Sequence, residues 1–160
     1  MRKICAVVVA VVVGALSLSG AGSAVAEPQL PRIVTYTENV GTVGDHDYCR
    51  GAFNVGMVAP KGTRGVVRVT LKSFGFTGNG IGWKRNPKCR FLVGLNVSGT
   101  RTIGQEIFFP VAFGPRAGEK VVRDVRPGSG PGAVGVGTYA INNPVRVQLS
   151  YGTAYYTMVP

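Results

Sequence analysis

The sequence predicts an all-β fold, namely a single antiparallel β-sandwich of about eight strands. Many segments alternate apolar and polar residues with a period of two, as strands with one buried face do. Gly, Pro and Asn separate these segments, and no segment after residue 26 has the pattern of a helix. Stacked sheets bury such one-faced strands. We therefore expect an immunoglobulin-like or related Greek-key sandwich first, and a small β-barrel second.

The clearest strand in the sequence is Val66–Phe74. Its alternating apolar residues are Val67, Val69 and Leu71, and the positions between them are polar. The β-branched residues in this run favour an extended backbone. We expect a half-buried strand here, with one face in the core and the other in solvent.

The other expected strands have ends that are set by Gly, Pro and Asn. They span residues 32–37, 48–58, 90–97, 105–113, 119–126, 133–141 and 145–151, with 154–159 extending the last. Pro110 has no N–H to donate to a ladder, so its strand is expected to lie at a sheet edge or to be kinked. The strands on either side of Gly114–Gly118 are expected to form a hairpin. Residues 41–47 and 75–88 are expected to be connections without regular structure.

Residues 1–26 have the three-part layout of a secretory signal peptide. Arg2 and Lys3 give a positive start, an apolar run extends from Ile4 to Leu18, and small residues lead to Ala24-Val25-Ala26. The apolar run is shorter than the roughly 20 residues that cross a bilayer. The sequence therefore predicts cleavage after Ala26. Residues 27–160 would then be one domain, secreted or associated with the cell envelope and not membrane-spanning.

The expected mature chain is strongly basic. Cleavage removes two of the 18 Lys and Arg residues and none of the seven acidic residues, which leaves a net charge of +9. Such a charge attracts anionic polymers and surfaces without selecting one of them. Export favours an anionic cell-envelope polymer, lipid head groups or a protein partner over nucleic acid. The alternative is that the charge only keeps the protein soluble.

Two cysteines, Cys49 and Cys89, remain after the expected cleavage, because Cys5 is removed. In an oxidising compartment such a pair favours one disulfide. The closed loop is long enough for the chain-entropy model to assign it about 4 kcal/mol of stability. We expect both cysteines near strand ends, where they join the strands on either side of Val66–Phe74.

Candidates for catalysis are few. The only histidine lies in Asp45-His46-Asp47, where a carboxylate beside an imidazole can orient a base or a metal ligand. Consecutive loop residues rarely converge on one point, so we expect these aspartates to cap backbone groups instead. Ser129 lies between two glycines but lacks the Gly-x-Ser-x-Gly spacing of a nucleophile elbow. We therefore expect no enzyme, no catalytic residue, no metal site and no cofactor.

The most suggestive segment for binding is Gly78–Arg90. It holds the only tryptophan and four cations and has no acidic residue: Trp83, Lys84, Arg85, Lys88 and Arg90. An aromatic ring supplies apolar contact area and the cations supply long-range attraction, so these residues are the candidate binding loop for an anionic partner. The alternative is that Trp83 folds back onto the sandwich and the cations only face water.

The function that these features favour is a small, secreted, non-catalytic binding protein. The alternative function is a carrier that holds an apolar small molecule between its sheets. Six phenylalanines are candidates to line such a cleft, although core packing is the commoner use of Phe: Phe74, Phe76, Phe91, Phe108, Phe109 and Phe113.

A signal peptide, one compact all-β domain and few cysteines together resemble the layout of small secreted bacterial β-sandwich proteins. The enediyne-binding apoproteins are one such group. Their pattern has two disulfides, whereas this chain is expected to form one, and strong basicity is not a feature of that family. The resemblance implies a secreted sandwich, and it assigns a role to no residue of this chain.

Overall fold

The computed structural model describes residues 27–160, and the predicted signal peptide lies outside the described residues. This part of the chain forms nine strands and one short helix. The strands are β1 (Arg32–Val34), β2 (Asn39–Val43), β3 (Arg50–Val58), β4 (Val67–Thr77), β5 (Cys89–Ser98), β6 (Gln105–Phe113), β7 (Lys120–Val125), β8 (Gly130–Tyr139) and β9 (Thr153–Val159). The helix, α1 (Ile81–Arg85), lies between β4 and β5.

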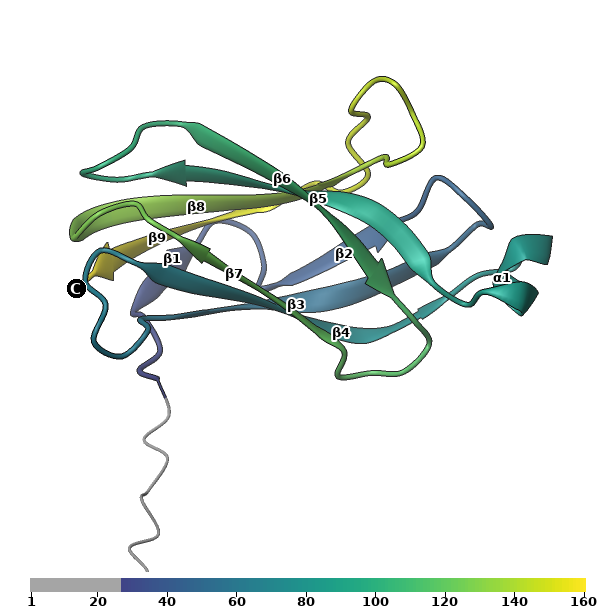
Figure 1. Ribbon diagram of the computed structural model, residues 1–160, viewed down its shortest axis with the longest axis horizontal. Coiled ribbons are helices and arrows are strands. Elements are labelled where there is room, and N and C mark those ends of the chain that lie inside the picture. Colours follow the sequence, from purple (N-terminus) through teal and green to yellow (C-terminus); the bar gives the residue numbers. More distant parts are fainter. Residues whose placement is uncertain (1–26) are drawn as a thin grey trace, which may run out of the picture.

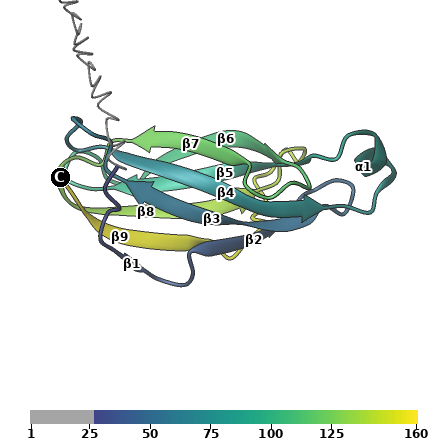
Figure 2. The same ribbon diagram turned by 90° about the horizontal axis from the view of Figure 1, so that it is seen from below.

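The strands form two antiparallel sheets that pack face to face (Figures 1 and 2). One sheet has five strands in the order β1-β9-β8-β5-β6, and the other has four in the order β2-β3-β4-β7. This arrangement confirms the predicted all-β fold of two stacked sheets, in place of the small barrel. Figure 1 shows α1 projecting from the end of the molecule opposite the C-terminus.

The core between the sheets is filled by side chains that point inward from both layers. Four phenylalanine rings, two from each sheet, have centroids between 5.6 and 6.2 Å apart: Phe53, Phe76, Phe91 and Phe113. Aliphatic residues from the same alternating positions complete the cluster. Burial of this apolar surface is the main force that holds the sheets together.

The central strand β4 has the predicted alternation, because Val67, Val69 and Leu71 are buried. The strand also continues past its expected end at Phe74, whose side chain is 53% exposed. Gly75 has a φ of +101°, and after it the alternation shifts so that Phe76 points into the core. A side chain at Gly75 would meet the carbonyl oxygen of Pro115 at 2.7 Å, so only glycine fits this position.

The predicted edge position of the Pro110 strand is confirmed, because β6 is the last strand of the five-stranded sheet. The predicted hairpin of β6 with β7 is wrong. β6 pairs with β5, whereas β7 pairs with β4 in the other sheet. The chain crosses between the layers because the β6–β7 turn is hydrogen-bonded to β4, with the N–H of Gly118 donating to the oxygen of Ser73 at 2.7 Å.

Three other expectations differ from the structure. Residues 41–47 were expected to be a connection, but β2 covers Asn39–Val43 and buries Val40 and Thr42 against the core. Pairing with β3 along the whole of β2 overrides the weak strand propensity of Asn and Gly. Residues 75–88 were expected to lack regular structure, but they include the end of β4 and the helix α1.

Residues 145–151 alternate as a strand should, and they form a loop instead. β5 occupies one edge of β8 from Ala133 to Tyr139, and β9 occupies the other edge only from Gly130 to Val136. Only the short stretch of β8 after Val136 is left for the segment, which makes one bridge there, between Gln148 and Tyr139, flanked by hydrogen bonds from the N–H of Ala140 to the oxygen of Val147 and from the N–H of Leu149 to the oxygen of Thr138. Its Val145 and Val147 side chains are exposed. No helix within residues 27–160 is long and apolar enough to span a membrane.

Candidate functional site

The outer face of the five-stranded sheet carries few charges. Strands in a two-layer sandwich usually direct polar residues outward. Here the outward positions of the sheet are mostly small or apolar, and they include Leu92, Gly94, Ala133, Gly135, Gly137, Tyr139, Ala154, Tyr156 and Met158. The outer face of the four-stranded sheet differs, because it carries Arg68, Lys72, Lys120 and Asp124.

Glycines on neighbouring strands remove side chains from the middle of this outer face. Gly94 of β5 lies opposite Gly137 of β8, and Asn96 lies opposite Gly135. Gly135 in turn lies opposite Ala154 of β9. Gly135 and Ala154 carry at most a methyl group and are partly exposed, so the backbone of the sheet itself forms the floor of a groove there, whereas Gly94 and Gly137 are buried.

Aromatic rings form one wall of the groove. Phe108 and Tyr139 pack edge to face with centroids 5.3 Å apart, and both rings lean over Gly94. A Cβ at Gly94 would lie 2.7 Å from the Tyr139 ring and 2.8 Å from the Phe108 ring, so glycine is required for this packing. The guanidinium of Arg146 lies 3.9 Å from the centroid of Phe108, in cation–π geometry.

The opposite wall comes from two loops. Tyr36 follows β1 and is 74% exposed, and Tyr151 precedes β9 and is 95% exposed. Polar side chains at the rim include Asn96, Glu106 and Gln148. The groove has a volume of about 700 Å³, within the usual range for small-molecule sites.

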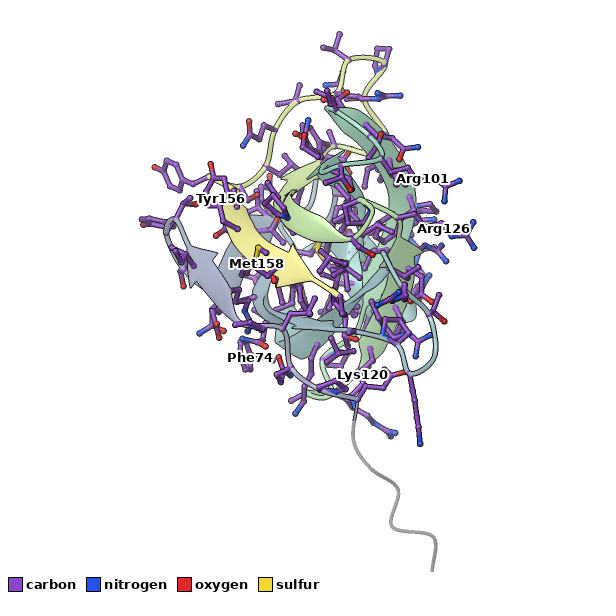
Figure 3. The ribbon with its side chains drawn as sticks, turned by 90° about the vertical axis from the view of Figure 1, so that its left-hand side faces the viewer. Phe74, Arg101, Lys120, Arg126, Tyr156 and Met158 are labelled. Atoms are coloured by element: carbon purple, nitrogen blue, oxygen red, sulfur yellow. A yellow bond between two sulfur atoms is a disulfide. The ribbon has the colours of Figure 1, made fainter. Side chains whose placement is uncertain are left out.

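A second hollow of about 660 Å³ continues along the same face toward the C-terminal end of the sandwich. It is lined by Ile33, Tyr156 and Met158, whose side chains are 73%, 54% and 60% exposed. Figure 3 views the molecule from this end and shows Tyr156 and Met158 on one side of it. The exposed apolar surface therefore extends over much of the five-stranded sheet.

The predicted disulfide between Cys49 and Cys89 is present, with Cα atoms 5.5 Å apart. Cys49 directly precedes β3 and Cys89 begins β5, so the bridge joins the two sheets at the α1 end of the sandwich. Both cysteines are fully buried. Gly44 packs directly on the bridge, because a Cβ at this position would collide with the sulfur of Cys49 and lie 2.9 Å from that of Cys89.

His46 uses both of its ring nitrogens in hydrogen bonds next to the disulfide. Its Nε2 accepts the backbone N–H of Arg90 at 3.0 Å, which places the proton on Nδ1. Nδ1 then donates to Oδ2 of Asp47 at 3.1 Å. The ring thus joins the loop before β3 to the first residues of β5, and neither nitrogen is left to act as a base.

Asp47 organises the segment that contains α1. Its Oδ1 accepts the N–H of Gly82 at 2.9 Å, and its backbone oxygen accepts the N–H groups of Asn79 and Gly80. The hydrogen bond from His46 lowers the pKa of the Asp47 carboxyl, and the bond from Gly82 lowers it further. Asp45 binds the backbone N–H of Asn142 in the same way. As expected, these aspartates cap backbone groups, but the groups belong to distant segments of the chain.

The structure separates the members of the predicted binding loop. Trp83 is partly buried, packs against the core and covers Gly78. Lys88 is bound to both carboxylate oxygens of Glu119, at 3.0 and 2.9 Å, which lowers the pKa of that carboxyl. Lys84, Arg85 and Arg90 are exposed, and Ile81 is the apolar residue that α1 presents to solvent.

The six phenylalanines that were candidates to line a cleft lie in different places, and four of them pack in the core, the commoner use of Phe. Phe76, Phe91, Phe109 and Phe113 are buried between the sheets, and Phe74 is exposed on the four-stranded sheet. Only Phe108 lines the groove. Sequence reasoning missed the groove because a glycine within a strand does not show which residue of the neighbouring strand it will face. The sequence did hold one indication of the groove. Gly135 and Gly137 of β8, and Gly94 of β5, occupy the alternate positions that face away from the core.

Within residues 27–160, no group of three or more His, Cys, Asp and Glu residues is arranged to hold a metal ion. Comparison with known proteins adds no assignment, since no family model, curated protein or solved structure matches the chain significantly.

Proposed function

We propose that the protein is a non-catalytic binding module that holds a flat, largely uncharged small molecule in the groove on its five-stranded sheet. The observation that supports this most is the floor of Gly135 and Ala154 beside the Phe108–Tyr139 wall. A flat backbone surface next to aromatic rings suits a planar ligand, because one face of the ligand loses contact with water on the floor and its edge does so against the rings.

This proposal moves the apolar ligand from between the sheets to the outside of one of them. The interior is occupied by packed phenylalanine rings, whereas the groove outside is open and of about 700 Å³. Asn96, Glu106 and Gln148 at the rim supply hydrogen-bonding groups that orient a bound molecule. The engagement of His46 and Asp47 in structural hydrogen bonds supports binding over catalysis.

A valine at Gly135 tests the groove. Its Cβ meets nothing closer than 3.4 Å, and a β-branched residue suits a strand, so Gly135→Val fills the floor without disturbing the fold. We expect the affinity for Nile red, an uncharged planar dye, to fall at least about tenfold because the new side chain occupies the binding surface. Fluorescence titration measures this affinity.

Gly56→Val is the matched control. Gly56 lies in the middle of β3, faces outward on the four-stranded sheet and has its nearest atom 3.8 Å from an added Cβ. We expect this variant to bind the dye as the unsubstituted protein does. Equal affinity of all three proteins, or no binding by any of them, contradicts the proposal. Native mass spectrometry of protein taken from its producing cell then identifies a resident ligand by its mass.

A second candidate function is contact with an anionic component of the cell envelope. Most carboxylates of the described chain are bound to partners, as Glu27 and Asp124 are to Arg68, so the free charge of its surface is largely positive. Lys84, Arg85 and Arg90 at the α1 end are exposed and available for such contact. Lys84→Glu with Arg85→Glu should abolish retention on envelope material, and unchanged retention removes α1 as the contact.

The wider setting of both functions is also proposed. We infer that residues 1–26 direct export and are removed after Ala26, and that the two-sheet topology is immunoglobulin-like. The buried disulfide supports export, because such bonds persist in oxidising compartments. Mass spectrometry of the secreted chain tests the cleavage site.

A further inference from the structure

Three loops meet at the end of the sandwich opposite α1. They are the β3–β4 turn, the β5–β6 turn and the segment that follows β7. Each contributes one arginine to a single cleft of about 380 Å³, namely Arg64, Arg101 and Arg126. Figure 3 shows Arg101 and Arg126 pointing outward on the same side of this end.

Backbone hydrogen bonds hold the three loops together. The N–H of Arg101 donates to the oxygen of Pro127 at 2.8 Å, and the N–H of Gly128 donates to the oxygen of Gly65 at 3.1 Å. The hydroxyl of Thr100 donates to the oxygen of Ser129 at 2.9 Å. The cleft is therefore built by the fold, and it does not depend on the arginine side chains for its shape.

Two glycines allow the loops to approach this closely. Gly65 and Gly128 have φ values of +68° and +93°, which side chains rarely adopt. A Cβ on Gly65 would lie 3.1 Å from the Cα of Gly128, and a Cβ on Gly128 would lie 2.9 Å from the Cβ of Arg101. Any larger residue at either position would push the three arginines apart.

No acidic residue lines this cleft, and no carboxylate in residues 27–160 forms an ion pair with its three arginines. The nearby Asp124 lines an adjacent hollow with Arg101 and Arg126. Its two oxygens accept hydrogen bonds from Arg68, at 2.8 and 2.9 Å, which lower its pKa most, and the charge of Arg126 lowers it further without an ion pair between them. Three like charges in one cleft repel one another, and an anion that enters the cleft removes this cost.

We propose that this cleft binds a phosphate group. A guanidinium donates paired hydrogen bonds to an oxyanion, and a phosphate offers at least two terminal oxygens and at least one negative charge to such donors, whether it is a free ion or a diester. The hydroxyl of Thr63 also lines the cleft. The phosphate belongs to a free ion or to a lipid head group. This inference partly rests on the second candidate function, contact with an anionic component of the cell envelope. It places that contact at the three-arginine cleft, at the end of the molecule opposite α1.

The test compares three triple variants, each of which removes three positive charges. Arg64→Gln with Arg101→Gln and Arg126→Gln empties the cleft. Arg50→Gln with Lys72→Gln and Lys120→Gln removes exposed cations from the region of the four-stranded sheet and is the control for net charge. Lys84→Gln with Arg85→Gln and Arg90→Gln removes the exposed cations of the α1 end.

Binding of inorganic phosphate and inorganic pyrophosphate is measured by calorimetry at constant ionic strength. Binding to phosphatidylcholine vesicles with and without phosphatidylglycerol is measured by sedimentation. We expect the cleft variant to lose at least about tenfold in affinity and the charge control to lose less than about twofold. If the cleft variant loses affinity for the free ions, the ligand of the cleft is a soluble phosphate compound. If it loses affinity for the vesicles alone, the ligand is a lipid head group.

Equal losses in the cleft variant and the charge control overturn the proposal, because the attraction is then only a matter of net charge. A loss confined to the α1 variant also overturns it and returns the contact to α1. Absence of binding to every probe overturns it as well. The cleft variant should bind Nile red as the unsubstituted protein does, since none of its three arginines lines the groove. A failure of the cleft proposal can therefore be told apart from a failure of the groove proposal.

Discussion

Asp47 connects three parts of the chain at the disulfide end of the molecule. It binds His46 beside it, the N–H of Gly82 in α1 and, through its backbone oxygen, the residues that lead into α1. Gly80 and Gly82 are both required next to it, since a Cβ on either would collide with its carboxylate. The conformation of α1 thus depends on one side chain 35 residues away from Gly82.

Asp47→Ala should loosen α1 without unfolding the sandwich. The N–H of Gly82 loses its charged acceptor, so its hydrogen exchange should become faster, while the amides of β4 and β5 keep their protection. Hydrogen exchange followed by nuclear magnetic resonance measures each amide. Asp45→Ala is the control, because Asp45 binds Asn142 and has no contact with α1. Unchanged exchange at Gly82 in the Asp47 variant contradicts this role.

For Asp45 and Asp47 the sequence predicted that their side chains cap backbone groups, but it did not identify the residues that they bind. Asp and Asn side chains cap backbone groups, and this preference was enough to expect a structural role for Asp45 and Asp47. The residues that they bind are 97 and 35 positions away, so the partners depend on the folded arrangement. The same reason hides the groove, because Gly94 and Gly137 are neighbours only after β5 and β8 have paired.

The disulfide is the element that joins the two sheets covalently. Its cysteines are 40 positions apart in sequence, and the bridge encloses all of β3, β4 and α1. Hydrogen bonds within each sheet cannot hold one sheet against the other. The core side chains and this bridge hold the two sheets together. His46 adds a link at the same end, between the β2–β3 loop and β5.

Replacing Cys49 and Cys89 by Ala should lower the free energy of unfolding by about 4 kcal/mol, the loop-closure contribution for a loop of this length. Urea denaturation of oxidised protein and of the variant measures the difference. Gly44→Ala adds a sharper test, because its methyl group would collide with Cys49 only while the bridge is present. Its destabilising effect should therefore shrink in the variant without cysteines. Independent effects of the two changes contradict the packing described for Gly44.

Elements were predicted well where the local pattern and the available pairing partner agree. β4 and β6 have strong alternation and a free neighbouring strand, and both formed. Residues 145–151 alternate equally well, but β9 takes one edge of β8 as far as Val136 and β5 takes the other, so only the last residues of β8 are left for them. β2 shows the opposite case, because a weak pattern became a strand when β3 offered an open edge. Local propensity decides which segments can be strands, and competition for edges decides which of them are.

The two outer faces of the sandwich differ in chemistry. The five-stranded sheet presents glycines, aromatic rings and apolar side chains, whereas the four-stranded sheet presents lysines and the Arg68 ion pairs. The two ends differ as well, with the disulfide and α1 at one and the three-arginine cleft at the other. The groove and the cleft are separate surfaces, so a ligand in one leaves the other accessible.

Acid should destabilise the whole molecule. The pKa values of Glu119 and Asp124 are lowered, mainly by their hydrogen bonds with Lys88 and Arg68. The pKa of Asp47 is lowered by His46. A carboxyl with a lower pKa in the folded state binds fewer protons there than in the unfolded chain. Its stabilising contribution is therefore complete above the unfolded pKa and is lost as the pH falls through the folded value.

The free energy of unfolding should accordingly fall between about pH 5 and about pH 2. Urea denaturation across this range measures the slope. Glu119→Gln with Asp124→Asn removes two of the three groups, so the slope should become smaller in this variant. If the free energy of unfolding falls with pH equally in both proteins, these ion pairs are not the cause of the pH dependence.

The residue pattern alone was enough to predict stacked antiparallel strands and, given the expected loss of Cys5, the pairing of Cys49 with Cys89. Both follow from properties that a residue carries along the chain, namely the period of two and the count of cysteines. The pairing of strands into sheets, the position of the groove and the meeting of three arginines in one cleft became visible only in the folded chain. These features depend on contacts between residues far apart in sequence, and a pattern read along the chain contains no record of which segments become neighbours across it.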